Sequence, residues 1–226
     1  MSYKAIIFDM DGTIISTETI WATATQTILD KYVDHLSQEK KSEIKSHLRG
    51  LALYESCKLI AEHTLNNMSP DEIRAEKATI AHDLYETHGL AFIPYFPEFH
   101  QKVVGLGLKT AVATNAISQS VEHTLRHLPL QDYFAEHIYH IDMVNKVHKP
   151  NPAIFLHAAK MIGVEPKDCI VIEDSVHGVR AAKAAGMYCI GINTANERHL
   201  LHEADEIVDC YKEIDLEKLL TNTISD

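Results

Sequence analysis

Residues 5–13 read AIIFDMDGT: an apolar run, Ala5–Phe8, leads straight into Asp9, Asp11 and Gly12. A short apolar run that ends in turn residues is typical of a buried strand in a parallel sheet. In open α/β sheets, ligands bind at the carboxyl ends of the strands, which is where Asp9 and Asp11 fall. Two carboxylates two residues apart can converge on one metal ion or share acid–base work. Because a bare Asp-x-Asp-Gly is also a common solvated turn, the rest of the chain has to decide between these interpretations.

Further apolar runs of the same kind recur along the chain and alternate with helical patterns. We expect strands at Thr110–Ala113, Cys169–Ile172 and Cys189–Ile192, with a weaker candidate at Glu206–Val208. Between them, Ala153–Ile162 follows an Asn-Pro pair and precedes a glycine, which is the usual design of a capped helix. Strands that alternate with such helices predict an α/β fold with a doubly wound parallel sheet.

Residues 16–92 break this alternation and show only helical periodicity. Apolar residues recur there at steps of three or four, and no convincing strand is found. Residues 69–72, Ser-Pro-Asp-Glu, have the form of a capping box ahead of a helix, and Gly89 is a suitable end for that helix. We therefore expect a small all-helical domain at residues 16–92, inserted after the first strand of a core domain made of residues 1–15 and 93–226.

Three more polar clusters stand close to the expected strand ends. Thr114 and Asn115 offer a hydroxyl and backbone N–H groups before a helix, which together form a ready anion site. Lys149, in a proline-rich loop, is a point charge suited to a phosphate oxygen. Glu173 and Asp174 leave a strand and open a helix. Taken singly, each cluster is explained equally well by ordinary turn, cap or surface residues.

Taken together, the four clusters predict a site, because the carboxyl ends of parallel strands meet at one edge of a sheet. That edge would hold four carboxylates, whose mutual repulsion requires a cation nearby: Asp9, Asp11, Glu173 and Asp174. Oxygen-only ligands select a hard cation, and Mg²⁺ commonly takes one or two carboxylates plus a substrate phosphate. A carboxylate can also attack phosphorus to give an aspartyl-phosphate. We therefore expect a Mg²⁺-dependent phosphoryl-transfer enzyme whose nucleophile is Asp9.

Composition narrows the partners and the compartment. The 226 residues are 46% hydrophobic and 23% charged, which is ordinary for a soluble globular protein. The net charge of −11 argues against nucleic acid and anionic membranes as partners, since both reward Lys and Arg. We find no leader sequence and no apolar stretch of the ~18 residues that a membrane span needs. Four widely spaced cysteines show no metal or redox motif, so we expect a reduced, cytoplasmic protein.

Fifteen histidines invite a second metal hypothesis. His123 with His127, and His137 with His140, have suggestive spacing. No Cys or Glu completes either set in the sequence, so zinc is not expected at these positions.

At its four polar motifs the chain resembles the haloacid dehalogenase superfamily, in its phosphatase-type branch. The resemblance covers the full length, with Asp-Met-Asp-Gly-Thr, Thr-Asn, Lys-Pro and Glu-Asp-Ser in the order typical of that family. The stretch Phe155–Ala185 looks like the subgroup that holds β-phosphoglucomutase and sugar-phosphate phosphatases. The resemblance implies a Rossmann-like core with a helical cap after the first motif.

The resemblance also implies roles for the acidic residues. Asp9 would be the nucleophile and a Mg²⁺ ligand. Asp11 would protonate the leaving oxygen, then activate water, and ligate the metal through its backbone carbonyl. Asp174 would be a further metal ligand, and Glu173 would act in the first or the outer coordination shell.

Phosphate and substrate contacts are implied in the same way. Thr114, Asn115 and Lys149 would hold the transferred phosphoryl group. Glu18 and the turn that contains Arg49 are the expected cap contacts with the rest of the substrate. The expected substrate is a small phosphorylated metabolite, in particular a sugar phosphate.

Two alternatives to hydrolysis remain open. One is a phosphosugar mutase with the same core and a different cap, like β-phosphoglucomutase. In that enzyme a His early in the cap helps to regulate the general acid, and the matching position here is Trp21, which cannot take part in proton chemistry. Hydrolysis is therefore favoured. The other alternative is a non-catalytic regulatory or binding protein on the same fold, which the intact set of charged residues disfavours.

Overall fold

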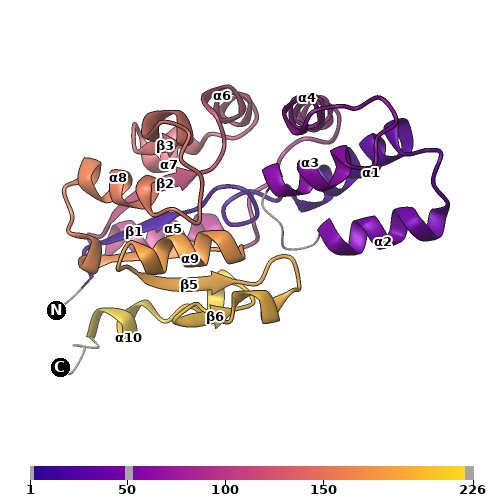
Figure 1. Ribbon diagram of the computed structural model, residues 1–226. Helices are drawn as coiled ribbons and strands as arrows, with labels where there is room; N and C mark the ends of the chain where they lie inside the picture. Colours follow the sequence, from indigo (N-terminus) through magenta and orange to yellow (C-terminus); the bar gives the residue numbers. More distant parts are fainter. Residues whose placement is uncertain (1–2, 49–52, 222–226) are drawn as a thin grey trace. The chain divides into compact units, whose positions relative to one another are not determined.

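The computed structural model of the chain describes residues 3–48 and 53–221. It divides into two compact units, an α/β unit of Met1–Ser16 and Leu90–Asp226 and a helical unit of Thr17–Gly89 (Figure 1). None of the helices in the described part of the chain is long and apolar enough to cross a membrane.

The α/β unit is built on one sheet whose neighbouring strands all pair in parallel. Its order is β3-β2-β1-β4-β5-β6, which places the first strand of the chain in the middle. The strands are β1 (Ala5–Phe8), β2 (Lys109–Thr114), β3 (Ile138–His140), β4 (Cys169–Glu173), β5 (Tyr188–Ile192) and β6 (Glu206–Val208). The predicted doubly wound α/β fold is therefore confirmed.

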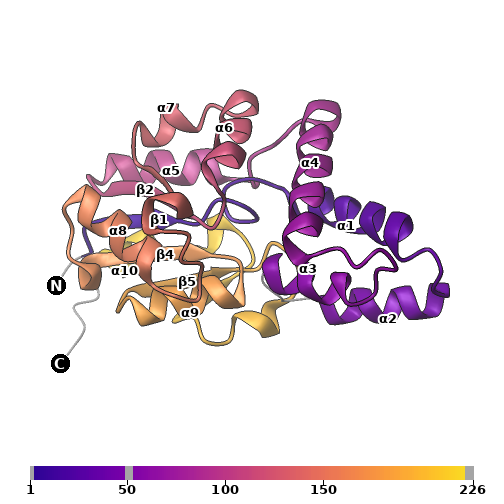
Figure 2. The same ribbon diagram turned by 45° about the horizontal axis from the view of Figure 1, so that its top comes forward.

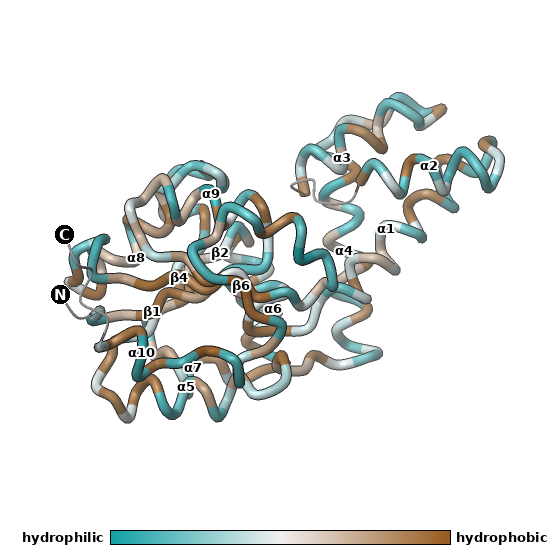
Figure 3. The backbone as a smooth tube through the Cα atoms, turned by 90° about the horizontal axis from the view of Figure 1, so that it is seen from below, coloured by the Kyte–Doolittle hydropathy of each residue, from teal (hydrophilic) through white to brown (hydrophobic). Residues whose placement is uncertain are grey.

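Helices cover both faces of this sheet, because alternate residues of each central strand face opposite ways. Ala5 and Ile7 pack with α8 (Ala153–Ile162) and α9 (Val176–Ala184). Ile6 and Phe8 pack on the other face, with helices that Figure 3 shows on that side of the strands: α5 (Phe96–Gly105), α7 (Leu130–Phe134) and α10 (Leu216–Thr221). The remaining elements connect these layers: α6 (Ser118–His127), η1 (Ile141–Val144), η2 (Pro166–Asp168), η3 (Arg198–Leu201) and η4 (Tyr211–Glu213).

The strand predictions are confirmed, and one strand was missed. The four apolar runs and the weaker candidate each lie in a strand, because the central strands are buried on both faces. The missed strand is β3, which has only three residues, Ile-Tyr-His, and no apolar run. Its pairing with Val112–Thr114 of β2 makes it a strand.

The helical unit contains α1 (Glu18–Tyr32), α2 (Gln38–Leu48), α3 (Leu53–Ala61) and α4 (Pro70–His88) (Figure 2). Helix α4 packs against both α1 and α3 around a small core that includes Ile28, Cys57 and Ile73. The predicted capping box is present, since Ser69 and Glu72 bond each other's backbone N–H groups. The same helix ends before Gly89 as predicted.

One ionisable side chain is buried in the aromatic core directly beneath the first strand. His100 of α5 is 5% exposed, and its ring lies 6.2 Å from that of Phe8 and 4.9 Å from that of Phe134. Its Nε2 lies 3.1 Å from the Thr110 hydroxyl. Burial lowers the pKa of His100 to about 4, so the ring is held neutral in the folded protein.

We expect His100 to make the fold sensitive to acid. The unfolded chain takes up a proton at this residue near pH 6.5, whereas the folded protein resists protonation until about pH 4. The contribution of His100 to stability is therefore greatest above pH 6.5 and falls by about 3 kcal/mol as the pH drops from 6.5 to 4. In urea titrations, His100→Leu should show a shallower loss of unfolding free energy over this range. Equal slopes for the two proteins would contradict the prediction.

Candidate functional site

The candidate site lies at the carboxyl edge of the sheet, where three neighbouring strands end together. Phe8 of β1 stands level with Val112 of β2 and Ile172 of β4. Parallel pairing therefore brings Asp9 level with the end of β4, and the Asp9 backbone N–H donates to the Ile172 carbonyl at 3.0 Å. Residues far apart in the chain meet at one edge for this reason.

Lys149 is the centre of the site's hydrogen-bond network. Its side chain is buried, and its ammonium donates to Asp9 Oδ1 at 2.5 Å and to Glu173 Oε1 at 2.8 Å. A third donation goes to the backbone carbonyl of Ala113 at 2.9 Å. All three ammonium protons thus have an acceptor, and the charge is compensated although it is nearly inaccessible to water.

The carboxylate of Glu173 has protein donors on both oxygens. Oε1 accepts from Lys149, and Oε2 accepts from the backbone N–H and the hydroxyl of Ser175 at 2.8 and 2.9 Å. The carboxylate fits against the first turn of α9 only because residue 178 is glycine: a Cβ there would lie 1.7 Å from Glu173 Oε1. The structure thus adds Ser175 and Gly178 to the site, and neither contact with Glu173 was predicted from the sequence.

Asp174 faces the loop after β1 on the other side of the strand end. Its Oδ1 accepts from the Thr13 hydroxyl at 3.3 Å. Gly12, which has a φ of +80°, passes close beside it, and a Cβ at Gly12 would lie 2.1 Å from Asp174 Oδ2. The glycine of the Asp-x-Asp-Gly motif is thus required both for its backbone angle and for this close approach.

Thr114, the last residue of β2, and Asn115, which follows it, lie at the same edge of the sheet. The Thr114 hydroxyl accepts from the backbone N–H of Ala116 at 3.0 Å. Asn115 Oδ1 accepts from the backbone N–H of Lys149 at 3.0 Å, which joins this turn to the lysine loop. The structure therefore brings together most of the predicted core residues: Asp9, Thr114, Asn115, Lys149, Glu173 and Asp174.

Burial makes the carboxyl groups of Asp9 and Asp174 difficult to ionise. It is the largest cause that raises the pKa of Asp9, with Lys149 acting against it and Glu173 adding to it. Burial and the neighbouring Glu173 likewise raise the pKa of Asp174 well above its ordinary value. Burial alone would lower the pKa of Lys149, but Asp9 and Glu173 outweigh it and raise that pKa. One ammonium does not balance this group of carboxylates.

The donor set fits a hard divalent cation. Asp9, Glu173 and Asp174 each offer a carboxylate oxygen within 4.8 Å of the others. Oxygen donors with excess negative charge are the environment that Mg²⁺ prefers in proteins. Since both oxygens of Glu173 already accept hydrogen bonds, Asp9 and Asp174 are the better placed ligands.

The two predicted substrate residues belong to the helical unit. Glu18 is exposed at the first residue of α1. Arg49 lies outside the described residues. The carboxylate and lysine network itself is made by residues of the α/β unit.

The helical unit also contains a buried lysine that the sequence did not reveal. Lys77 of α4 is 5% exposed, and its Nζ lies 5.9 Å from the centre of the Trp21 ring. Burial lowers its pKa, and among residues 3–48 and 53–221 no carboxylate forms an ion pair with it. By contrast, the buried Lys41 of α2 pairs with Asp30 at 3.5 Å.

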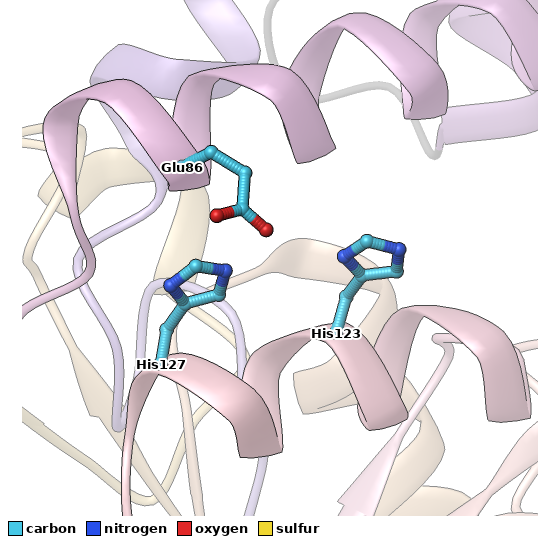
Figure 4. Close-up of side chains that lie close together, drawn as sticks. All are labelled: Glu86, His123 and His127. Carbon is cyan, nitrogen blue, oxygen red and sulfur yellow. The ribbon is translucent and has the colours of Figure 1, made fainter.

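The histidine pair on α6 does not form a zinc site within its own unit. His123 and His127 are one turn apart, and their rings point to the same side of the helix (Figure 4). Glu86, also drawn there, belongs to the helical unit. Two imidazoles fall short of the three protein ligands of a catalytic zinc site, and no other ligand from the described part of the α/β unit completes the set.

Comparison with known proteins points to one family. Residues 6–192 match the family model of the haloacid dehalogenase-like hydrolases. The chain is 30% identical over 200 residues to fructose-1-phosphate phosphatase YqaB of Escherichia coli. The aligned residues cover 84% of this chain and 96% of the relative.

Solved structures share the fold. A haloacid dehalogenase hydrolase of family IA from Entamoeba histolytica superposes with a TM-score of 0.82 at 21% identity, over 96% of this chain and 97% of that one. CbbY from Rhodobacter sphaeroides, solved in complex with xylulose 1,5-bisphosphate, superposes with a TM-score of 0.73 at 25% identity, over 93% and 96%. The family match extends over most of the chain and includes every strand that contributes a carboxylate to the site. The chain therefore belongs to the haloacid dehalogenase-like hydrolases.

Proposed function

We propose that this protein is a Mg²⁺-dependent phosphatase that hydrolyses a small sugar phosphate through an aspartyl-phosphate on Asp9. The observation that carries the proposal is the buried contact of Lys149 with Asp9 and Glu173 at the carboxyl edge of the sheet. A lysine that fixes one oxygen of a buried carboxylate orients the other oxygen toward an incoming phosphorus atom.

The reaction follows in two steps from the residues present. In the first step, a carboxylate oxygen of Asp9 forms a bond to phosphorus while the ester P–O bond breaks, and Asp11 gives its proton to the departing alcohol. In the second step, Asp11 takes a proton from water, the water oxygen bonds to phosphorus, and the bond to Asp9 breaks to release phosphate. Thr114 and Asn115 hold the phosphoryl oxygens throughout, and Lys149 keeps Asp9 in place and adds positive charge beside them, so that catalysis is mainly positioning and charge stabilisation.

The carboxylate cluster supports a proposal for the metal ligands. We place Mg²⁺ on the carboxylates of Asp9 and Asp174 and on the backbone carbonyl of Asp11. The ion, when bound, neutralises negative charge at the transferred phosphoryl group. Glu173 belongs to the outer shell, because its oxygens hold Lys149 and Ser175 in position.

Relatives and the helical unit suggest the substrate class. The Escherichia coli relative is named for fructose 1-phosphate, and CbbY was solved with xylulose 1,5-bisphosphate. Lys77 gives the helical unit a buried cation without a carboxylate partner among the described residues, which suits a second anionic or hydroxyl-rich part of a substrate. Glu18 and Arg49 remain candidates for the same role.

Phosphate release from a panel of sugar phosphates tests the function. We expect hydrolysis in Mg²⁺, loss of activity in excess EDTA, recovery when Mg²⁺ is returned, and inhibition by Ca²⁺, whose larger and looser coordination shell misplaces the phosphoryl group. The panel includes β-glucose 1-phosphate with a trace of the bisphosphate. Full activity in chelator would contradict the metal assignment. Formation of glucose 6-phosphate faster than inorganic phosphate would show a mutase instead.

Asp9→Asn tests the nucleophile, and we expect its activity to fall at least a thousandfold, a barrier change of ~4 kcal/mol. Because the pKa of Asp9 is raised on folding, the ionised side chain costs stability above its ordinary pKa of 3.8. In EDTA at neutral pH, the amide variant should therefore melt at or above the wild-type temperature. Activity within about tenfold of wild type, ~1.4 kcal/mol, would exclude Asp9 as nucleophile.

Lys77→Met tests the substrate contact, with Lys41→Met as the matched control. Both lysines are buried in the helical unit, but only Lys41 has a carboxylate partner among the described residues. We expect Lys77→Met to raise KM for the preferred sugar phosphate about tenfold, ~1.4 kcal/mol, while kcat changes little. Lys41→Met should leave KM within twofold. If both variants gave the wild-type KM, Lys77 would have no part in substrate binding.

A further inference from the structure

Tyr211 connects the loop that contains Asp11 to the core of the α/β unit. The side chain is 2% exposed, and its hydroxyl donates to the backbone carbonyl of Thr13 at 2.9 Å. The ring lies 5.0 Å from that of Phe99 and 5.7 Å from that of Phe96. A buried hydroxyl fixed by aromatic packing has little freedom to move, so it holds the carbonyl that it bonds.

Thr194 makes the same kind of contact one residue earlier in the loop. It follows β5, whose carboxyl end lies at the edge of the sheet where the site is found. Its hydroxyl donates to the backbone carbonyl of Gly12 at 2.7 Å. Two successive peptide groups of the loop are thus held by hydroxyls from distant parts of the chain. Thr194 lies 182 positions after Gly12, and Tyr211 lies 198 positions after Thr13.

These contacts matter because the loop has to hold a glycine in a left-handed conformation close beside Asp174. Gly12 has a φ of +80°, and the Thr13 hydroxyl donates to Asp174 Oδ1. Rotation of the Gly12 or Thr13 peptide group would shift Asp11, which precedes both, and would disturb the hydrogen bond between Thr13 and Asp174. Tyr211 and Thr194 both bond backbone carbonyls of the loop, so their hydroxyls act on the carboxylates through the loop.

We propose that Tyr211 and Thr194 are positioning residues that hold the Gly12 and Thr13 carbonyls and thereby fix Asp11 and Asp174 for catalysis and metal binding. The expected change in kcat rests on the proposed phosphatase activity. Its metal-binding readout does not depend on that activity, because Mg²⁺ alone is the titrant.

Tyr211→Phe and Thr194→Val each remove one hydroxyl and keep the shape of the side chain. We expect kcat to fall about tenfold in each, KM to stay within twofold, and the dissociation constant for Mg²⁺ alone, measured by calorimetry, to rise at least fivefold. Thr194→Ser keeps the hydroxyl and should restore wild-type values. The double variant should lose less than the product of the two single losses, because both hydroxyls restrain one loop.

Tyr139→Phe is the matched control for a purely structural effect. Tyr139 is also buried, and its hydroxyl bonds His137 Nδ1 at 2.9 Å, away from the loop. Both Tyr→Phe variants should lower the melting temperature, but the control should leave kcat and Mg²⁺ affinity unchanged. If Tyr211→Phe and Thr194→Val matched the control in both quantities, the proposal would be wrong. A wild-type protein that binds Mg²⁺ but releases no phosphate would instead refute the proposed function.

Discussion

The structure of the site depends on one buried ammonium group. Lys149 contacts Asp9 after β1, the Ala113 carbonyl within β2 and Glu173 at the end of β4, and so links three strands by one side chain. An unpaired charge at this depth would cost several kcal/mol, so the lysine can be buried only with a carboxylate beside it. The lysine in turn is needed to bury the carboxylates. Since the carboxylates outnumber it, the same arrangement leaves negative charge for a divalent cation.

The two adjacent acidic residues at the end of β4 have different hydrogen-bond partners. Glu173 turns toward Lys149 and is held by Ser175, whereas Asp174 turns toward Thr13 and Gly12. Each needs a glycine beside it, because a Cβ at residue 178 or residue 12 would overlap its carboxylate. The arrangement of this pair of carboxylates therefore requires the two glycines as much as it requires the two acidic residues.

Much of this arrangement could be predicted from the sequence because the physics is local or follows from strand order. Buried parallel strands give continuous apolar runs, and parallel strand ends share an edge, so the residue pattern alone was enough to place Asp9, Glu173 and Asp174 together. The features that the sequence could not reveal depend on tertiary packing. The strand β3 is made by its pairing with β2, and Lys77 is buried where α4 packs against α1 and α3. The roles of Glu18 and Arg49 stay predictions.

The hydrogen bond between Tyr211 and Thr13 joins residues that the ribosome makes at very different times. The ribosome produces Thr13 early and its partner 198 residues later, a delay of about 10–40 s at typical rates of synthesis. Through that interval the nascent chain already contains Asp9 and the loop that follows it but lacks Tyr211. Both hydroxyl contacts on the loop can therefore be complete only after translation has passed Tyr211.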